Sequence, residues 1–242
     1  MNILAPRVVL TYKKSSSARW LSHLDLIRTL ERAIRRAQTP VEFSQGFNPR
    51  PRLSFGPALP LGATSDAELI VLRLDNPIEP SELMERLNTQ LPEGIRVTDA
   101  KSVQEGQPAL QIIQGCSYIV RLVCRAEDPI AAVKNAIEDF MAQNEVIAER
   151  MDKGLFKRVN IRTSVESLEL MESVSAFEMP RSQVLASAPK NEPKHKTQEI
   201  VTIRMRLSHT GKHIAKPIEV AEALSKPGRE FRLISLHREL FY

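Results

Sequence analysis

The chemistry that this sequence could perform is concentrated in one segment, residues 44–62 (SQGFNPRPRLSFGPALPLG). The segment combines prolines, which fix φ, with guanidinium groups and aromatic rings, and it contains no Asp or Glu. Paired guanidinium N–H donors bind phosphate, an exposed ring stacks on a single-stranded base, and an amide can read a base edge. The segment therefore predicts contacts to RNA or another phosphate-rich ligand. We assign these contacts to Gly46, where a positive φ would allow close backbone approach, and to Phe47, Asn48, Arg50 and Arg52.

A second group of cations lies on the helix predicted just before this segment (SHLDLIRTLERAIRRAQ). Residues 1–62 contain ten Lys/Arg against three Asp/Glu, a net charge of +7, whereas the whole chain carries +5. Such a local excess is typical of a surface that binds a polyanion, although a solvated arginine face without a ligand stays open. We expect the helix arginines to converge with the loop arginines on one cationic pocket. The residues added to the predicted phosphate-binding set are Arg19, Arg28, Arg32, Arg35 and Arg36.

Acid–base chemistry has one candidate, His23, which stands with Asp25 at the start of the predicted helix. Both residues could instead bind the free amides of the first helical turn, and we favour this structural role over catalysis. The chain has no P-loop, no dinucleotide-binding glycine motif and no nucleophile elbow. Among its histidines only His209 and His213 stand at metal-ligand spacing, and they flank a predicted turn with no Cys to join them, which argues against a zinc site. We therefore expect no metal and no cofactor, and we incline against an enzyme.

These side chains must be positioned by an α+β scaffold. Apolar residues at helical spacing predict helices, and β-branched or aromatic runs predict strands. The expected elements of the first half are a strand at Val8–Tyr12 resuming near Ala18–Leu21, a helix from the N-cap Ser22 to Pro40, extended segments at Val41–Ser44 and Arg52–Phe55, a strand at Ala67–Leu74, a helix at Pro80–Leu91 and a strand at Ile95–Ala100. Strand, helix, strand, strand, helix, strand is the order of a ferredoxin-like domain, an antiparallel sheet with two helices on one face.

The second half repeats this order loosely. Its expected elements are strands at Ser117–Cys124, Val146–Glu149, Arg158–Ile161, Gln198–Leu207 and Phe231–Leu236, with helices at Pro129–Met141 and from Pro217 to near Ser225. We therefore predict an α+β protein of two tandem ferredoxin-like (βαββαβ) domains. Their bounds are 1–104 and 116–242, with a linker at 105–115 and a mobile loop at about 180–197.

Length and composition fit a soluble two-domain protein of 242 residues. No apolar run approaches the ~18 residues of a membrane span, and the first residues lack the apolar core of a signal peptide. Cys116 and Cys124 are too few for a disulfide scaffold, and eight residues apart on one strand they could not meet. We expect two buried thiols and a cytoplasmic protein without membrane contact.

Residues 7–100 carry a dense set of motifs: LSHLD (21–25), Arg28, ERA (31–33), RRA (35–37), SQGFNP (44–49), Pro51, SF (54–55), LPLG (59–62), Glu68 and LPEGIRV (91–97). In these motifs the chain resembles a bacterial family of unknown function, the radical SAM-linked proteins. The resemblance implies a radical SAM enzyme as partner, encoded separately or fused to such a chain. This chain is not that enzyme itself, because three closely spaced cysteines hold the iron–sulfur cluster there. Beyond residue 100 the resemblance is looser, and Asn160 stands where the family often has Asp.

We therefore expect a non-catalytic accessory protein that binds RNA or another phosphate-rich substrate and presents it to a radical SAM enzyme. Two alternatives stay open. One is an RNA-processing enzyme with His23 as general acid or base, because CRISPR repeat-processing endonucleases also have tandem ferredoxin-like domains with a basic face. The other is a structural subunit whose loop binds only the partner protein.

Overall fold

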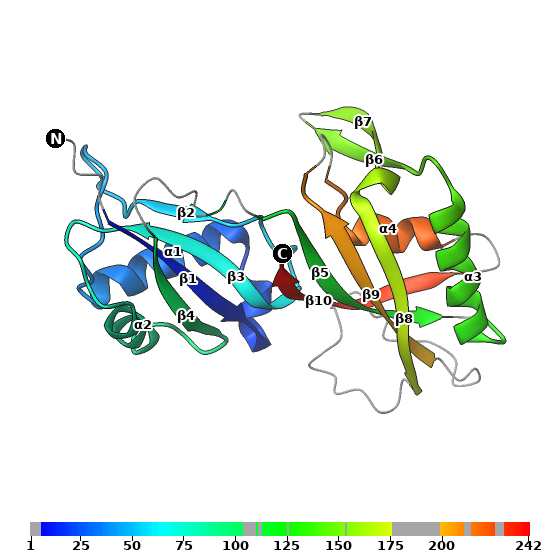
Figure 1. Ribbon diagram of the computed structural model, residues 1–242, viewed down its shortest axis with the longest axis horizontal. Helices are drawn as coiled ribbons and strands as arrows, with labels where there is room; N and C mark the ends of the chain where they lie inside the picture. Colours follow the sequence, from blue (N-terminus) through cyan, green and yellow to red (C-terminus); the bar gives the residue numbers. More distant parts are fainter. Residues whose placement is uncertain are drawn as a thin grey trace. The chain divides into compact units, whose positions relative to one another are not determined.

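A computed structural model describes residues 6–103, 110, 113–124, 126–152, 154–175, 199–210, 214–225 and 230–242. The chain divides into two compact units, Met1–Ile112 and Ile113–Tyr242. Both are α+β, with mainly antiparallel strands and, within the described ranges, two α-helices each (Figure 1). Most of the linker predicted at 105–115 and all of the loop predicted at 180–197 lie outside the described residues.

The first unit has the element order strand, helix, strand, strand, helix, strand. Its elements are β1 (Arg7–Lys14), the 3₁₀ helix η1 (Ser16–Trp20), α1 (His23–Arg36), β2 (Leu53–Phe55), β3 (Thr64–Arg73), α2 (Pro80–Asn88) and β4 (Ile95–Val103). The hydrogen-bonded order is β4-β1-β3-β2, and every neighbouring pair is antiparallel. The strands and helices expected in this half are present to within a few residues, with one exception.

The exception is the stretch Ala18–Leu21, where the predicted continuation of the first strand is wrong. Ser16 has a φ of 49°, which turns the chain out of the extended conformation. Backbone hydrogen bonds from Ala18 to Ser15 and from Leu21 to Ala18, of 3.1 and 3.0 Å, then close the short helix η1. Ser22 caps α1 as expected, because its hydroxyl accepts from the Asp25 amide at 3.2 Å and donates to the Asp25 carboxylate at 2.6 Å.

One hydrophobic core shows that both helices of the first unit cover the same face of its sheet. Apolar side chains at alternate positions on β1 and on β3 belong to this core, together with one apolar stripe of each helix. The buried members include Val8, Leu10, Tyr12, Ile70, Leu72, Leu26, Leu30, Ile34, Leu83 and Leu87. The helical spacing of apolar residues placed Leu24 on the buried stripe of α1. That placement is wrong, because Leu24 is 64% exposed. It lies two residues before Leu26, which turns it by about 200° to the far side of the helix.

The second unit contains one strand more than expected. Its elements are β5 (Gly115–Cys124), α3 (Pro129–Ala142), β6 (Ile147–Asp152), β7 (Leu155–Asn160), the 3₁₀ helix η2 (Arg162–Ser164), β8 (Val165–Ser175), β9 (Glu199–Ser208), α4 (Pro217–Leu224) and β10 (Phe231–Phe241). The sheet order is β10-β5-β9-β8, all antiparallel, and β6 and β7 pair only with each other (Figure 1). With this hairpin set aside, the strand order is the same as in the first unit.

Strand β8 was not predicted. Its pairing with β9 is shifted twice, between Val165 and Ser167 and between Leu170 and Glu172. Each shift inserts an extra residue and breaks the alternation of apolar and polar side chains by which a strand is recognised. The strands expected at Val146–Glu149 and Arg158–Ile161 exist as β6 and β7, but they form the separate hairpin.

The hairpin is fastened to α4 by Arg150, which gives the first testable prediction. Its guanidinium donates to both Glu219 oxygens, at 2.6 and 2.7 Å, and to the Ile214 carbonyl at 2.6 Å. Burial alone would raise the pKa of Glu219, but the hydrogen bonds from Arg150 and from the Lys216 amide lower it. A carboxyl with a lowered pKa stabilises the folded state above its unfolded pKa, and this contribution is lost as the pH falls through the folded pKa.

We expect Glu219→Gln to lower the free energy of unfolding near neutral pH by about 1–3 kcal/mol and to flatten its loss on acidification. Urea unfolding between about pH 3 and 7 measures both effects. Glu222→Gln, an exposed position on the same helix, is the matched control and should keep the wild-type pH profile. Parallel profiles for wild type and Glu219→Gln would contradict the assignment.

Candidate nucleic-acid interface

The residues after α1 form an exposed tip, defined here as residues 45–50. Two isolated bridges, Val41 with Leu74 and Phe43 with Pro51, hold the base of this segment against the rest of the first unit. At the neck, the Ser44 amide donates to the Arg50 carbonyl at 2.8 Å and the Arg50 amide donates to the Ser44 hydroxyl at 3.0 Å. Every residue of the tip is exposed. The sequence therefore builds a closed loop with its side chains directed to solvent.

The tip carries an aromatic ring and a cation that the fold does not use. Phe47 is fully exposed, at 106% of its reference area. Gly46 beside it has a φ of 129°, which other residues rarely adopt. Within the described part of the chain, the Arg50 side chain makes no hydrogen bond or ion pair. A free ring beside a free guanidinium, with Asn48 between them, is suited to stacking a base and contacting its phosphate.

Arg35 holds the tip in place from α1. Its guanidinium donates to the Pro49 carbonyl and lies over the Phe43 ring, 4.8 Å from the ring centre. Both partners are neutral, so its positive charge is oriented but not cancelled. Arg35 is therefore a positioning residue whose charge also contributes to the field around the tip.

Three of the other predicted cations are committed to partners within the first unit. Arg28 pairs with Asp25 at 3.3 Å, and Arg52 pairs with Glu42 at 2.7 Å. Arg19 is buried, at 8% exposure, and its guanidinium lies 4.7 Å from the centre of the Trp20 ring. The pair of Arg52 with Glu42 forms because the strand-like segment before the tip brings Glu42 beside Arg52. The predicted cationic surface is thus smaller than the arginine count suggests.

Arg32 and Arg36 lie elsewhere, on the wall of a groove of about 460 Å³ in the first unit. Arg32 donates to the Thr29 hydroxyl at 3.2 Å. Arg36 donates to the Gln90 carbonyl at 2.6 Å and to its side-chain oxygen at 3.3 Å. Among the residues described, no carboxylate forms an ion pair with either guanidinium.

The structure does not gather the predicted arginines in one pocket, contrary to our expectation. Arg35 and Arg36 are consecutive on α1, so their side chains diverge by about 100° around the helix axis. One reaches the tip after α1, and the other reaches the turn after α2. The arginines therefore form two separate cationic sites, the tip and the groove, which lie on either flank of α1.

His23 has neighbours that sequence analysis missed. It is exposed, its ring packs edge-on against Phe55 at 5.4 Å, and it lines a cavity of only about 10 Å³ with Lys14 and Glu68. Lys14 and Glu68 are 2% and 4% exposed. Burial lowers the pKa of Lys14, while attraction to Glu68 opposes this effect. The sequence did contain a signal for the burial of Lys14. Lys14 lies two residues after the buried Tyr12, so both side chains are on the same side of β1.

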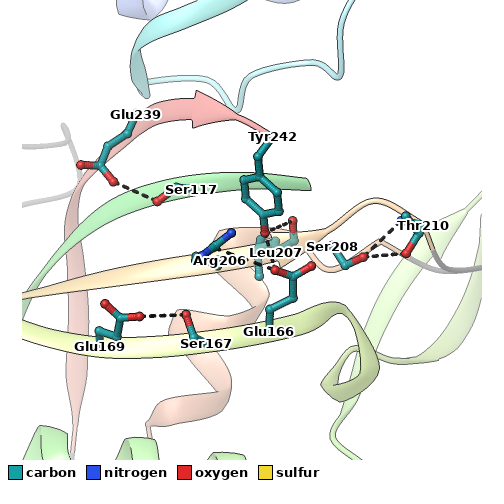
Figure 2. A network of polar contacts seen from close by, with 10 residues as sticks. All are labelled: Ser117, Glu166, Ser167, Glu169, Arg206, Leu207, Ser208, Thr210, Glu239 and Tyr242. Carbon is teal, nitrogen blue, oxygen red and sulfur yellow. Dashed lines mark hydrogen bonds and ion pairs between the residues drawn. The ribbon is translucent and has the colours of Figure 1, made fainter. Parts of the chain in front are cut away.

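The second sheet also carries arginines, but these are ion-paired. Arg204 and Arg206 of β9 pair with Glu239 at 3.1 Å and with Glu166 at 4.0 Å. Figure 2 shows Tyr242 over this face, where its hydroxyl donates to Glu166 at 2.6 Å. Burial and the Glu166 carboxylate raise the pKa of Tyr242 to about 12. Because carboxylates already neutralise these arginines, this face is a poor site for a polyanion.

Several large apolar side chains that the sequence pattern did not assign to any function are exposed. Trp20 is 43% exposed on η1. Met151, Leu155 and Phe156 are 70–74% exposed on the hairpin of β6 and β7. Cys116 and Cys124 are buried on β5 as thiols rather than as a disulfide, as expected. Sequence patterns could not separate the exposed apolar residues from core residues, because each stands in an ordinary strand or helix pattern.

Within the described ranges, no three side chains of His, Cys, Asp or Glu come close enough together to hold a metal ion. Nor does any described helix have the length and apolar character needed to cross a membrane. The expected cytoplasmic location stays a prediction.

Residues 7–210 match a family described as an uncharacterized protein conserved in bacteria (DUF2344). The chain belongs to this family. The description names no radical SAM enzyme, so that partner stays a prediction. No curated protein matches the chain.

Solved structures with a similar chain course include two from H/ACA assemblies. One is an H/ACA RNP bound to a substrate RNA containing 2'-deoxyuridine, with 9% identity and a TM-score of 0.45. Another is an archaeal box H/ACA sRNP Nop10–Cbf5 complex, with 11% identity and a TM-score of 0.43. In each case 96% of this chain is covered but only 46% of the other. An unknown protein from Galdieria sulphuraria has 14% identity, coverage of 95% and 98%, and a TM-score of 0.25. At such scores these likenesses carry no argument about function.

Proposed function

We propose that this protein is a non-catalytic accessory protein that binds single-stranded RNA through its first unit and presents it to a partner enzyme. We take both units as ferredoxin-like domains, the second with an inserted hairpin. The strand orders β4-β1-β3-β2 and β10-β5-β9-β8 support this view. The partner we propose is a radical SAM enzyme, in line with the resemblance described above.

The observation that carries the proposal is the tip. It presents a fully exposed Phe47 next to Arg50, whose side chain has no partner in the described part of the chain, on a loop fastened by Arg35. Stacking of one base on an aromatic ring contributes about 1–3 kcal/mol and tolerates any base. Each phosphate contact adds an electrostatic contribution that weakens with salt. The ion-paired arginines of the second sheet offer no comparable surface.

A binding role fits the surroundings of His23 better than a catalytic one. The cavity beside it, of about 10 Å³, has room for roughly one water molecule. Asp25, the residue expected to orient the histidine in a catalytic pair, is engaged by Ser22 and Arg28 instead. His23 as the acid or base of an RNA-processing enzyme is therefore the second candidate, favoured only by the nearby Lys14 and Glu68.

Fluorescence anisotropy with a labelled single-stranded RNA tests the proposal. We expect Phe47→Ala to weaken binding by about 5- to 150-fold, the equivalent of 1–3 kcal/mol for one stacked base. Arg50→Ala should make the salt dependence shallower by ~0.7 in the slope of log K against log salt. Arg28→Ala, which removes an exposed arginine already paired with Asp25, is the matched control and should change little.

Three outcomes decide between the candidates. Absence of binding by the wild-type chain at about 50 mM salt, or wild-type affinity in both tip variants, would overturn the RNA proposal. Cleavage of the RNA that disappears in His23→Ala would favour the processing enzyme. Co-purification with a radical SAM enzyme that fails in Phe47→Ala but survives Arg50→Ala, without RNA binding, would favour a structural subunit.

A further inference from the structure

The groove beside α1 is a second feature of the first unit that the fold alone does not explain. Its volume of about 460 Å³ falls in the range of sites for small ligands, roughly 300–1,000 Å³. Its lining comes from three places in the sequence: η1, the exposed flank of α1, and the turn between α2 and β4. The lining residues used below are Ala18, Leu21, Arg32, Arg36, Leu91 and Glu93.

Gly94 sets the width of the groove. Its carbonyl accepts from the Ser15 amide at 2.8 Å, which joins the turn after α2 to the chain just before η1. A Cβ at this position would lie 2.5 Å from the Ser15 oxygen and 2.9 Å from the Ala18 Cβ. The glycine also has a φ of 85°, in the left-handed region. Only a glycine lets the two walls approach so closely.

The walls differ in chemistry. Ala18, Leu21 and Leu91 supply apolar surface. On the α1 side, Arg32 and Arg36 stand about one helical turn apart, and both line the groove. A guanidinium has five N–H donors. Within the described part of the chain, Arg32 uses its side chain for one hydrogen bond and Arg36 for two, all to neutral acceptors. Donors and positive charge thus remain for a ligand.

We propose that this groove binds one nucleoside monophosphate unit, either free or as one nucleotide of an RNA chain. Arg32 and Arg36 hold the phosphate, for which their paired N–H donors are suited. The base lies on the apolar surface of Leu21 and Leu91, and the side chains of the turn meet its polar edge. Glu93, on the exposed rim, disfavours a phosphate at its own end of the groove and so orients the ligand with its phosphate toward α1. The RNA form of this inference rests on the proposed function, whereas the free-nucleotide form does not.

The chain contains one tryptophan, Trp20, which gives the experiment its signal. It is 43% exposed and directly follows two residues of η1, Ala18 and Arg19, of which Ala18 lines the groove. We expect UMP or AMP to bind saturably, as heat in isothermal titration calorimetry and as a change in Trp20 fluorescence. Uridine lacks the phosphate, and inorganic phosphate lacks the nucleoside. Each should therefore bind at least ~10-fold more weakly than UMP, the equivalent of about 1.4 kcal/mol or more.

Variants separate the groove from general charge effects. The double variant Arg32→Ala/Arg36→Ala should lose at least ~10-fold in affinity for UMP, and Arg32→Lys/Arg36→Lys should recover part of it, since lysine keeps the charge but not the paired donors. Arg86→Ala removes an exposed arginine of α2 that pairs with Glu82 outside the groove, and it should bind like wild type. Circular dichroism confirms that the variants are folded.

The outcomes of the two proposals are distinguishable. Absence of heat with UMP and AMP in the wild-type chain, or wild-type affinity in the Arg32→Ala/Arg36→Ala variant, overturns the groove assignment even if RNA binds at the tip. Saturable binding of UMP that is lost in this variant supports the groove, whether or not the anisotropy experiment detects RNA. Competition by UMP for labelled RNA, unaffected by Phe47→Ala, assigns the groove to one nucleotide of the RNA chain.

Discussion

Replacing Lys14 by Met is expected to lower the free energy of unfolding by about 3 kcal/mol, because it removes a buried ammonium that binds the Leu21 carbonyl and attracts the buried Glu68 carboxylate. Lys14 and Glu68 are 2% and 4% exposed at one end of the first core. The Lys14 ammonium donates to the Leu21 carbonyl at 2.9 Å and attracts Glu68. Methionine keeps the length of the side chain, so the loss reports the charge and the hydrogen bond rather than a cavity. Urea unfolding measures it.

Lys13 provides the matched control on the same strand. It points to the opposite side of β1 and forms an exposed pair with Asp66 at 3.3 Å. We expect Lys13→Met to change the free energy of unfolding by about 0.5 kcal/mol or less. The double variant Lys14→Met/Glu68→Gln should regain part of the loss, because a neutral amide costs less to bury than a carboxylate once the nearby Lys14 charge is gone. A Lys14→Met protein as stable as wild type would contradict a stabilising role of the buried ammonium.

Gly94→Ala is expected to cost about 3 kcal/mol or more, the second large effect. The left-handed φ of 85° costs a non-glycine residue about 1–2 kcal/mol. The added Cβ would also meet the Ser15 backbone oxygen at 2.5 Å, so one wall of the groove must move. We expect a lower midpoint in urea unfolding together with weaker binding of UMP.

Gly154 separates these two causes. It has a similar φ of 82°, but no atom lies within 4 Å of the position a Cβ would take. Gly154→Ala should therefore show only the conformational cost of about 1–2 kcal/mol and leave UMP binding unchanged. Equal losses of stability in the two variants would show that the close approach of the added Cβ to the Ser15 oxygen has no cost of its own.

In the proposed function, α1 serves two neighbouring sites. Its Arg35 fastens the tip, and its Arg32 and Arg36 face the groove. The core beneath holds the helix through Leu26, Leu30 and Ile34. A ligand at either site thus meets cations whose backbone is fixed by packing, which reduces the entropy lost on binding.

Much of the first unit could be predicted from the sequence, because its signals are local. Ser22 caps the helix, and Ile27, Leu30 and Ile34 follow helical spacing. The β-branched and aromatic content of Val8–Tyr12 and the apolar run in Ala67–Leu74 predicted the strands β1 and β3. The element order then follows from reading these signals along the chain. Strand β8 was not predicted because its two bulges break the alternation of apolar and polar residues. The helix η1 was not predicted because a single positive φ at Ser16 has no effect on the hydrophobic pattern.

The order of residues alone is enough to assign an α+β class, to show that cations are concentrated in the first 62 residues, and to place Phe47 and Arg50 on one short loop. Which of those cations remain available for a ligand depends on the three-dimensional fold. Arg52 meets Glu42, and Arg32 and Arg36 meet neutral groups, because strands and turns distant in sequence pack beside them. The burial of Lys14 near Glu68 and the groove narrowed by Gly94 arise in the same way. Hydrophobic patterning is local and can be read along the chain, whereas charge neutralisation depends on which side chains the fold brings within a few ångströms of each other.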